Sequence, residues 1–294
     1  MSNTIHTSAI ETTGLRKSYK GKLALDSVDL VVPAGSVCAL LGANGAGKST
    51  LMKILAGLQK ADGGSATLLG KDPWKEANEL RLQVAYVAEK PKFYDWMTVA
   101  NTGWFASGFY PSGFEANFQQ VCQRLKLDPS VKLSALSKGG YAKVALAVAL
   151  AMDPKVLLLD EPTSGLDLFT RRDFLSGMVE LAGEGKTVLI SSHNLAEVER
   201  VASQVVFIEG GRVILNQPME ALKRRLVRLR QRGEPAFRID TVGKVLRKGK
   251  DGPWSEWIVL CHESAEIKPE HGFEPIGLEE MYEVLLGAQE EAVA

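Results

Sequence analysis

The chain has 294 residues, no formal net charge, 45% hydrophobic and 24% charged residues, the balance of a globular protein with a sizeable core. Zero net charge gives no global field that would steer the chain onto nucleic acid, and no apolar stretch approaches the roughly 18 residues of a membrane span. The first residues lack the basic and apolar blocks of a signal peptide, and three distant cysteines match neither a disulfide framework nor a metal-ligand pair. We therefore expect a cytoplasmic protein that reaches a membrane only through a partner.

The first strong local signal is a strand, a glycine-rich turn and a helix in succession. Residues 37–41, VCALL, form an apolar run short enough for a buried strand, and residues 51–56, LMKILA, have the apolar spacing of a helix. Between them, residues 42–50 read GANGAGKST and match the phosphate-binding pattern G-x-x-x-x-G-K-[ST] at each required position. This context predicts a nucleoside triphosphate site rather than an ordinary glycine turn before a core helix.

Each residue type in this loop suits phosphate binding. Glycines let backbone N–H groups curl around phosphate oxygens, and the positive end of the following helix adds to the attraction. Lys48 places a positive charge near the outer phosphates, and the Ser49 hydroxyl is a hard oxygen ligand of the kind that Mg²⁺ prefers. The predicted nucleotide contacts in the loop are Gly42, Ala43, Asn44, Gly45, Ala46, Gly47, Lys48, Ser49 and Thr50.

A second strand, which ends in carboxylates, is expected within residues 155–162, KVLLLDEP. Its apolar run is typical of a buried parallel strand and is followed by Asp160 and Glu161. Asp160 would hold Mg²⁺ directly or through water, and Glu161 would orient the attacking water and accept its proton. The alternative is a core strand that meets a polar turn, but adjacent carboxylates repel unless a cation or a function holds them.

Between these two motifs, residues 133–144, LSALSKGGYAKV, open a long alanine-rich helix. They resemble the signature sequence of ATP-binding cassette (ABC) ATPases, the energy-supplying subunits of membrane transporters, which usually reads L-S-G-G-Q. The interval from Leu136 to Asp160 is also similar to that family. The resemblance covers about residues 10–226 and implies hydrolysis of ATP to ADP and phosphate, with Mg²⁺ as cofactor.

Further motifs of the resemblance follow in the family's order. Residues 164–167, SGLD, resemble the loop after the carboxylate strand, and His193, after a strand expected at residues 187–190, resembles the histidine that senses the terminal phosphate. Tyr19 resembles the aromatic that stacks on adenine. Taken alone, His193 would be a helix-capping or surface histidine and Tyr19 a core aromatic. The resemblance implies catalytic roles for Glu161, His193 and Lys48, metal ligation by Ser49, Asp160 and Glu89, and further nucleotide contacts at Tyr19 and Asp167.

Members of the family work as head-to-tail pairs, so the resemblance also implies partners. Two ATP molecules would lie between the phosphate loop of one subunit and the signature of the other, in a homodimer or a heterodimer. Ser137 and the backbone amide of Gly139, at a helix N-terminus, would bind the terminal phosphate across that interface. An integral-membrane permease is the second implied partner, and no nucleic acid is expected.

Three positions depart from the family pattern. Glu89 stands where the family commonly has glutamine, and a carboxylate there would still ligate Mg²⁺ or water while it adds negative charge. In the signature, Lys138 replaces a glycine and Gly140 replaces the glutamine; the lysine side chain points either to the partner's phosphate or to solvent. Because Glu161 and His193 are both present, we expect hydrolysis to survive these changes.

A strongly aromatic segment follows Glu89. It contains Phe93, Tyr94, Trp96, Trp104, Phe105, Phe109 and Tyr110. We expect most of these side chains to be buried in a helical insert at about residues 93–149. By resemblance, part of the segment would form the groove that receives a short cytoplasmic helix of the permease.

Opposite charge blocks mark the last part of the chain. Residues 221–250 hold eleven basic and two acidic residues, whereas residues 251–294 hold one basic and eleven acidic residues. The basic block is interpreted as a solvated helix that the acidic block compensates, in preference to a patch for nucleic acid or anionic lipid. The patterns predict two strands around Gly210 and Gly211, strands at residues 236–240 and 257–261, and a closing amphipathic helix at residues 277–286.

Together these features predict an α/β fold: a RecA-like P-loop NTPase core with an antiparallel β subdomain, a helical subdomain and a small C-terminal α+β appendage. The cassette is expected at residues 1–226 and the appendage at residues 227–294. The predicted function is an ATPase subunit that powers transport, with export favoured, through a separate permease at the cell membrane. The alternatives are a soluble cassette that acts on ribosomes or nucleic acid, and a regulatory subunit with little turnover.

Overall fold

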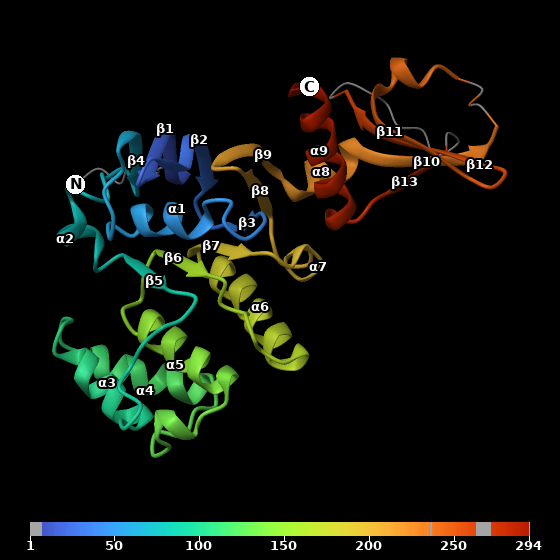
Figure 1. Ribbon diagram of the computed structural model, residues 1–294. Coiled ribbons are helices and arrows are strands. Elements are labelled where there is room, and N and C mark those ends of the chain that lie inside the picture. Colours follow the sequence, from blue (N-terminus) through green and yellow to red (C-terminus); the bar gives the residue numbers. More distant parts are fainter. Residues whose placement is uncertain (1–7, 234, 236, 263–271, 294) are drawn as a thin grey trace. The chain divides into compact units, whose positions relative to one another are not determined.

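Residues 8–233, 235, 237–262 and 272–293 are described by the computed structural model of the chain (Figure 1). The chain divides into two units, Met1–Asn216 and Gln217–Ala294. The division comes earlier than residue 226 because helix α8 (Met219–Arg225) packs with strands β10 (Leu226–Arg232) and β12 (Trp254–Cys261) of the second unit. None of the described helices is long and apolar enough to span a bilayer.

A six-stranded sheet in the order β5-β6-β7-β3-β8-β9 forms the centre of the first unit. Its strands are β3 (Val37–Leu41), β5 (Val84–Val87), β6 (Val156–Asp160), β7 (Thr187–Ser192), β8 (Gln204–Glu209) and β9 (Arg212–Pro218). Neighbours from β5 to β8 are parallel, and β3, β6 and β7 are buried along their whole length, as the apolar runs predict. The strand predictions at residues 37–41 and 187–190 are confirmed.

The second sheet of this unit is antiparallel, in the order β2-β1-β4. It consists of β1 (Ser8–Tyr19), β2 (Lys22–Pro33) and β4 (Gly63–Leu68). Helix α1 (Lys48–Leu55) lies between the two sheets (Figure 1). One continuous core joins these layers, for example Ile10 and Val32 of the antiparallel sheet, Leu51 of α1 and Leu158 of β6. This packing fixes α1 against the end of β3, where the phosphate loop lies.

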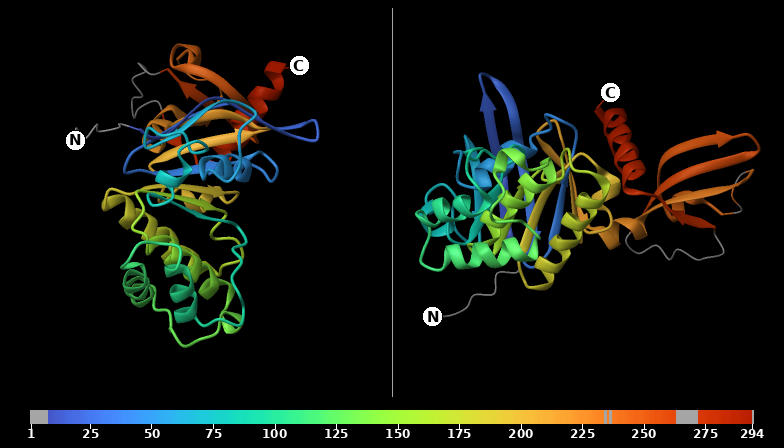
Figure 2. Two further views of the ribbon diagram at one scale, coloured as in Figure 1. Left: turned by 90° about the vertical axis from the view of Figure 1, so that its left-hand side faces the viewer. Right: turned by 90° about the horizontal axis from the view of Figure 1, so that it is seen from below.

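Helices gather on the other side of the six-stranded sheet (Figure 2). They are α3 (Val99–Ser107), α4 (Phe114–Arg124), the 3-10 turn η1 (Leu133–Ala135), α5 (Lys138–Leu150) and α6 (Leu168–Gly183), while α2 (Ala77–Leu80) and α7 (Leu195–Val198) are single turns. Helices α3, α4 and α5 share their own core, which includes Val99, Phe118 and Val144. This bundle occupies most of the segment predicted as a helical insert.

The aromatic segment is more exposed than its composition suggests. Phe93 and Tyr110 pack against the helical core. Five others are exposed, so the expectation that most of the segment is buried is wrong: Tyr94, Trp96, Trp104, Phe105 and Phe109. The core of the bundle is already filled by side chains from α4, α5 and the η1 turn, which leaves the outer face of α3 without a covering element among the described residues.

An antiparallel sheet in the order β11-β12-β10-β13 dominates the second unit. Besides β10 and β12 it contains β11 (Gly243–Asp251) and β13 (Phe273–Pro275), and it is accompanied by the 3-10 turn η2 (Ile239–Thr241) and helix α9 (Leu278–Val293). Val227, Leu229, Trp257 and Val259 are among its core side chains. The predicted strand at residues 257–261 and the closing helix are confirmed.

Two expectations for this unit are wrong. The basic block is not one solvated helix, because residues 226–232 form β10, in which Val227 and Leu229 are buried and the arginines alternate with them. The predicted strand at residues 236–240 includes the η2 turn instead, and residue 236 lies outside the described residues. Charge compensation does occur: Arg228 and Arg247 both form ion pairs with Glu256 and Glu280.

Candidate functional site

The phosphate loop takes a shape that only glycine permits at two positions. Gly47 has φ +112°, a left-handed conformation, and an added Cβ would lie 2.6 Å from the carbonyl oxygen of Ala24. A Cβ on Gly42 would overlap the carbonyl oxygen of Ile208. Sheet β1–β2 and strand β8 therefore approach the loop backbone directly, which explains why the pattern requires small residues there.

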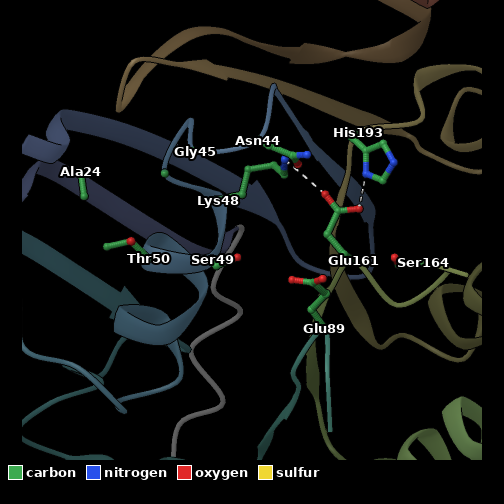
Figure 3. A pocket seen from close by; sticks show the side chains of 11 residues that line it. Ala24, Asn44, Gly45, Lys48, Ser49, Thr50, Glu89, Glu161, Ser164 and His193 are labelled. Carbon is green, nitrogen blue, oxygen red and sulfur yellow. Dashed lines mark hydrogen bonds and ion pairs between the residues drawn. The ribbon is translucent and has the colours of Figure 1, made fainter.

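The loop borders a pocket of about 460 Å³ at the carboxyl ends of the parallel strands (Figure 3). Side chains and backbone from β2, the loop, α1, and the turns after β5, β6 and β7 converge on it. Its lining residues are Ala24, Asn44, Gly45, Gly47, Lys48, Ser49, Thr50, Glu89, Glu161, Ser164 and His193. The strand order thus brings together four motifs that are far apart in the sequence.

Lys48 is buried at the base of this pocket. Its Nζ donates hydrogen bonds of 2.7 Å to the Gly42 carbonyl and 3.2 Å to the Ala43 carbonyl. The same ammonium lies 3.2 Å from Oε1 of Glu161, so it forms an ion pair with that carboxylate. A buried charge of this kind is stabilised only by such partners, and phosphate oxygens are ligands of the same type.

Glu161 is held between Lys48 and His193, as Figure 3 shows. Nδ1 of His193 lies 2.8 Å from Oε2 of Glu161, and because an ionised carboxylate can only accept, Nδ1 carries the hydrogen. Oε1 is buried and accepts no hydrogen bond from any described residue. Glu161 also has φ +48°, a conformation that non-glycine residues rarely adopt and that concentrates at functional sites.

Asp160, at the end of β6, is buried and accepts three hydrogen bonds. Its Oδ1 lies 3.1 Å from Oγ of Ser49 and 2.8 Å from Oγ of Ser191, and its Oδ2 lies 3.4 Å from the hydroxyl of Tyr86. Burial, and then the charge of Asp160, raise the pKa of Tyr86, which keeps the phenol protonated as a donor.

The residues around Asp160 fit a magnesium site, although no cluster of three or more His, Cys, Asp or Glu side chains occurs in the described part of the chain. The Ser49 hydroxyl and the Asp160 carboxylate are hard oxygen donors, already within 3.1 Å of each other beside the phosphate loop. Mg²⁺ usually takes one or two protein oxygens and fills its other positions with phosphate and water. Glu89 lines the same pocket, and its carboxylate lies 3.6 Å from Nζ of Lys90.

Seven predicted nucleotide contacts do not line this pocket, and four of them lie outside the phosphate loop. Ser137 caps α5 by accepting from the Gly140 N–H at 3.1 Å, and Gly139 packs against Thr170. Asp167 caps α6 through the N–H groups of two following residues. Tyr19 is 43% exposed and its hydroxyl donates to Gln59 at 2.6 Å. Within the loop, Gly42, Ala43 and Ala46 also stay outside the lining: the first two supply carbonyls to Lys48, and Ala46 joins the core.

Other residues of the site were not predicted individually. Ala24 and Ser164 line the pocket, and Ser164 begins the SGLD motif. Ser191 and Tyr86 contact Asp160 from β7 and β5, on either side of β6. The register of the parallel strands could have identified them, because residues near the end of a neighbouring strand lie at the same edge of the sheet as Asp160.

Comparison with known sequences identifies relatives of this chain. Residues 25–164 match the family described as ABC transporter. The chain is 33% identical to the fluoroquinolones export ATP-binding protein Rv2688c of Mycobacterium tuberculosis, over 78% of this chain and 79% of the relative. It is 38% identical to the probable multidrug ABC transporter ATP-binding protein YbhF of Escherichia coli over 71% of its own length, and spans 37% of YbhF.

Solved structures agree with these relatives. An ATP-binding subunit of an ABC transporter superposes with a TM-score of 0.66 at 30% identity, over 74% of this chain and 92% of the other. CbiO1 of Clostridium perfringens, part of the ABC transporter complex cbiONQ, superposes with a TM-score of 0.66 at 28% identity, over 73% of this chain and 90% of the other. These similarities confirm the predicted P-loop NTPase fold, and the chain belongs to the ABC transporter family, among its ATP-binding proteins.

Proposed function

We propose that this chain is the ATP-hydrolysing subunit of a transporter and that it drives export through a separate integral-membrane permease. Family membership supports ATP as the ligand, and relatives named as export, multidrug and drug-resistance ATP-binding proteins support this direction of transport. The observation that carries the proposal is the buried Glu161 carboxylate: Oε1 accepts no hydrogen bond from the described residues and is held only by the ion pair with Lys48, while His193 holds Oε2.

The pocket residues divide into those that bind phosphate and those that act on water. The loop N–H groups and Lys48 bind the β- and γ-phosphates, and the Lys48 ammonium exchanges its loop carbonyls for phosphate oxygens as the nucleotide enters. As Lys48 turns to the phosphates, Oε1 of Glu161 is released to orient a water molecule and accept its proton. His193 holds Glu161 through Nδ1 and faces the terminal phosphate. Ser49 and Asp160 would hold Mg²⁺, which when bound neutralises phosphate charge.

A second ABC subunit completes the site in this proposal. Ser137, Gly139 and Asp167 stay outside the pocket of their own chain, although their motifs are those that the family places at the nucleotide. Helix α5 is thirteen residues long, and its N-terminus offers a partial positive charge to an anion. We assign these residues to the pocket of the partner, which is a second copy or a related cassette.

The exposed aromatic side chains of the α3 region are proposed as the docking surface for the permease. Tyr94 contacts Trp96 and Phe105 at ring-centroid distances of 6.0 and 5.8 Å, and Phe105 contacts Phe109 at 5.5 Å, so these four rings form one patch. Trp104, which precedes Phe105 on α3, is also exposed. Exposed contiguous aromatics mark interaction sites, and a short helix of the permease fits such a surface. Docking there would hold the chain at the cytoplasmic face of the membrane.

Phosphate release by the purified chain with Mg²⁺ and ATP tests the ATPase. We expect steady turnover that Glu161→Gln lowers by about 100-fold or more, while ATP binding persists. Turnover that is absent in the wild type, or unchanged in the variant, would contradict the assignment. Co-purification with an integral-membrane protein is the expected partner result; co-sedimentation with ribosomes would instead indicate a soluble cassette without a transport role.

A further inference from the structure

We propose that Ser191 is a positioning residue that ties the metal-binding carboxylate of Asp160 to the backbone of Glu161, so that one hydroxyl aligns both acids of the site. The inference rests on the proposed ATPase function and extends it to a residue that no motif singles out. Ser191 lies near the end of β7, fully buried, and is paired with Asp160 in the parallel register between β6 and β7.

Two short hydrogen bonds place the Ser191 hydroxyl between the acids. Its Oγ donates to Oδ1 of Asp160 at 2.8 Å and accepts the backbone N–H of Glu161 at 2.8 Å. A hydroxyl has one donor hydrogen and two acceptor lone pairs, so both bonds form at once. The same carboxylate oxygen also accepts from Ser49, which links Ser191 to the predicted magnesium ligands.

Glu161 needs such an anchor because its backbone is strained. Strand β6 ends at Asp160, and Glu161 turns out of the sheet with φ +48°. A non-glycine residue stays in this conformation only when its surroundings hold it there. The Ser191 hydroxyl satisfies the buried N–H of Glu161 in that turn. This backbone turn directs the Glu161 carboxylate toward Lys48 and His193.

Removal of the hydroxyl would therefore act on two parts of the chemistry. Asp160 would keep its hydrogen bonds from Ser49 and Tyr86 but lose its shortest one, which weakens its orientation toward Mg²⁺. The Glu161 N–H would lose its partner, and the carboxylate would no longer be held at one position relative to the phosphates. The hydrogen bonds of the Ser191 hydroxyl go to Asp160 and to the Glu161 N–H rather than to the phosphate loop, so we expect nucleotide binding without metal to persist.

A matched control is available on the same strand. Thr187 begins β7, is 2% exposed, and its hydroxyl accepts the Gly35 N–H at 3.0 Å. Thr187→Val thus deletes a buried hydroxyl that satisfies one backbone N–H, as Ser191→Ala does, but at the strand end away from the pocket. Ser191→Cys tests packing, because sulfur fills the space of the hydroxyl yet donates and accepts only weakly.

The experiment compares these variants with the wild type by four measurements: the melting temperature, kcat and KM for ATP hydrolysis, ATP affinity in EDTA, and the gain in ATP affinity when Mg²⁺ is added. We expect Ser191→Ala and Ser191→Cys to lower kcat by about 10- to 100-fold and to reduce the Mg²⁺-dependent gain in affinity. ATP affinity in EDTA should stay near that of the wild type. Thr187→Val should lower only the melting temperature.

Equal kcat and Mg²⁺ response in Ser191→Ala and Thr187→Val would overturn the inference, and so would full recovery in Ser191→Cys, because packing alone would then explain the residue. Failure of this inference can be distinguished from failure of the proposed function. If the wild type hydrolyses no ATP, the ATPase proposal fails, whereas the Mg²⁺-dependent change in ATP affinity still decides the role of Ser191.

Discussion

Nδ1 of His193 lies 2.8 Å from Oε2 of Glu161. The two residues follow different strands of the parallel sheet, β7 and β6, which are neighbours. The Glu161 carboxylate is buried, whereas 57% of the His193 side chain is exposed, so the histidine reaches inward from the open side of the pocket. It is thereby placed to hold the carboxylate and to meet a phosphate at the pocket mouth.

Replacement of His193 by alanine is expected to lower kcat for ATP hydrolysis by about 100-fold, because Glu161 loses the group that orients it. ATP affinity should change little, since the phosphate loop and Lys48 remain. Phosphate release and equilibrium nucleotide binding measure the two effects. His262→Ala, at an exposed position of the second unit, is the control and should leave both unchanged.

Substitution of alanine at Gly47 is expected to abolish nucleotide binding. The added Cβ would lie 2.6 Å from the Ala24 carbonyl, in a backbone with φ +112° that alanine rarely adopts. Gly177→Ala, within α6 and with open space around its Cβ, should instead raise stability by about 0.5–1 kcal/mol. Calorimetric ATP titration and urea denaturation of both variants measure these changes. Normal ATP affinity in Gly47→Ala would refute the loop geometry.

Glu89→Gln is predicted to change the magnesium dependence of ATP hydrolysis. Glu89 lines the pocket and adds a negative charge where the family commonly has a neutral amide. Its removal should raise the Mg²⁺ concentration at half-maximal rate, because one oxygen ligand of full charge is lost. A magnesium titration of the rate measures this. If the rate and its magnesium dependence stay the same, Glu89 is neither a metal nor a water ligand.

Loss of the aromatic patch should uncouple the chain from its permease without harming the fold. Trp104 and Phe109 are 65% and 73% exposed, so Trp104→Ala with Phe109→Ala should leave basal ATP hydrolysis and the melting temperature near wild type. Co-purification with the permease should be lost. Trp74→Ala removes an exposed tryptophan from another part of the chain and should keep the complex. An intact complex in the double variant would place docking elsewhere.

The three cysteines are predicted to resist alkylation in the native protein. Burial raises the pKa of the Cys122 thiol from 9.0 to about 11, and raises the pKa values of Cys38 and Cys261 as well. Since the unfolded chain releases these protons first, the contribution of the three thiols to the free energy of unfolding is constant well below pH 9.0 and falls as the pH rises above it. Mass spectrometry after iodoacetamide treatment at pH 8 should find three labels in urea and almost none without it.

Local sequence patterns were enough to predict those elements whose apolar residues follow the regular spacing of a strand or a helix. The strand, loop and helix around Lys48 and the strand that ends at Asp160 follow from short apolar runs and obligatory glycines. The same reasoning failed at residues 226–232, where a run of arginines hid the alternation of Val227 and Leu229. It also failed for the aromatic segment, because composition does not indicate which face of α3 packs against the rest of the helical bundle.

Motifs alone establish that the chain carries a triphosphate loop, two adjacent carboxylates and a following histidine, because each is a local pattern with its own chemistry. The folded chain adds that Lys48, Glu161 and His193 meet and that Ser191 joins both acids, since these contacts arise from the order of parallel strands. It also separated Ser137 and Asp167 from the pocket of their own chain. Strand order is a property of long-range packing, which no local pattern records.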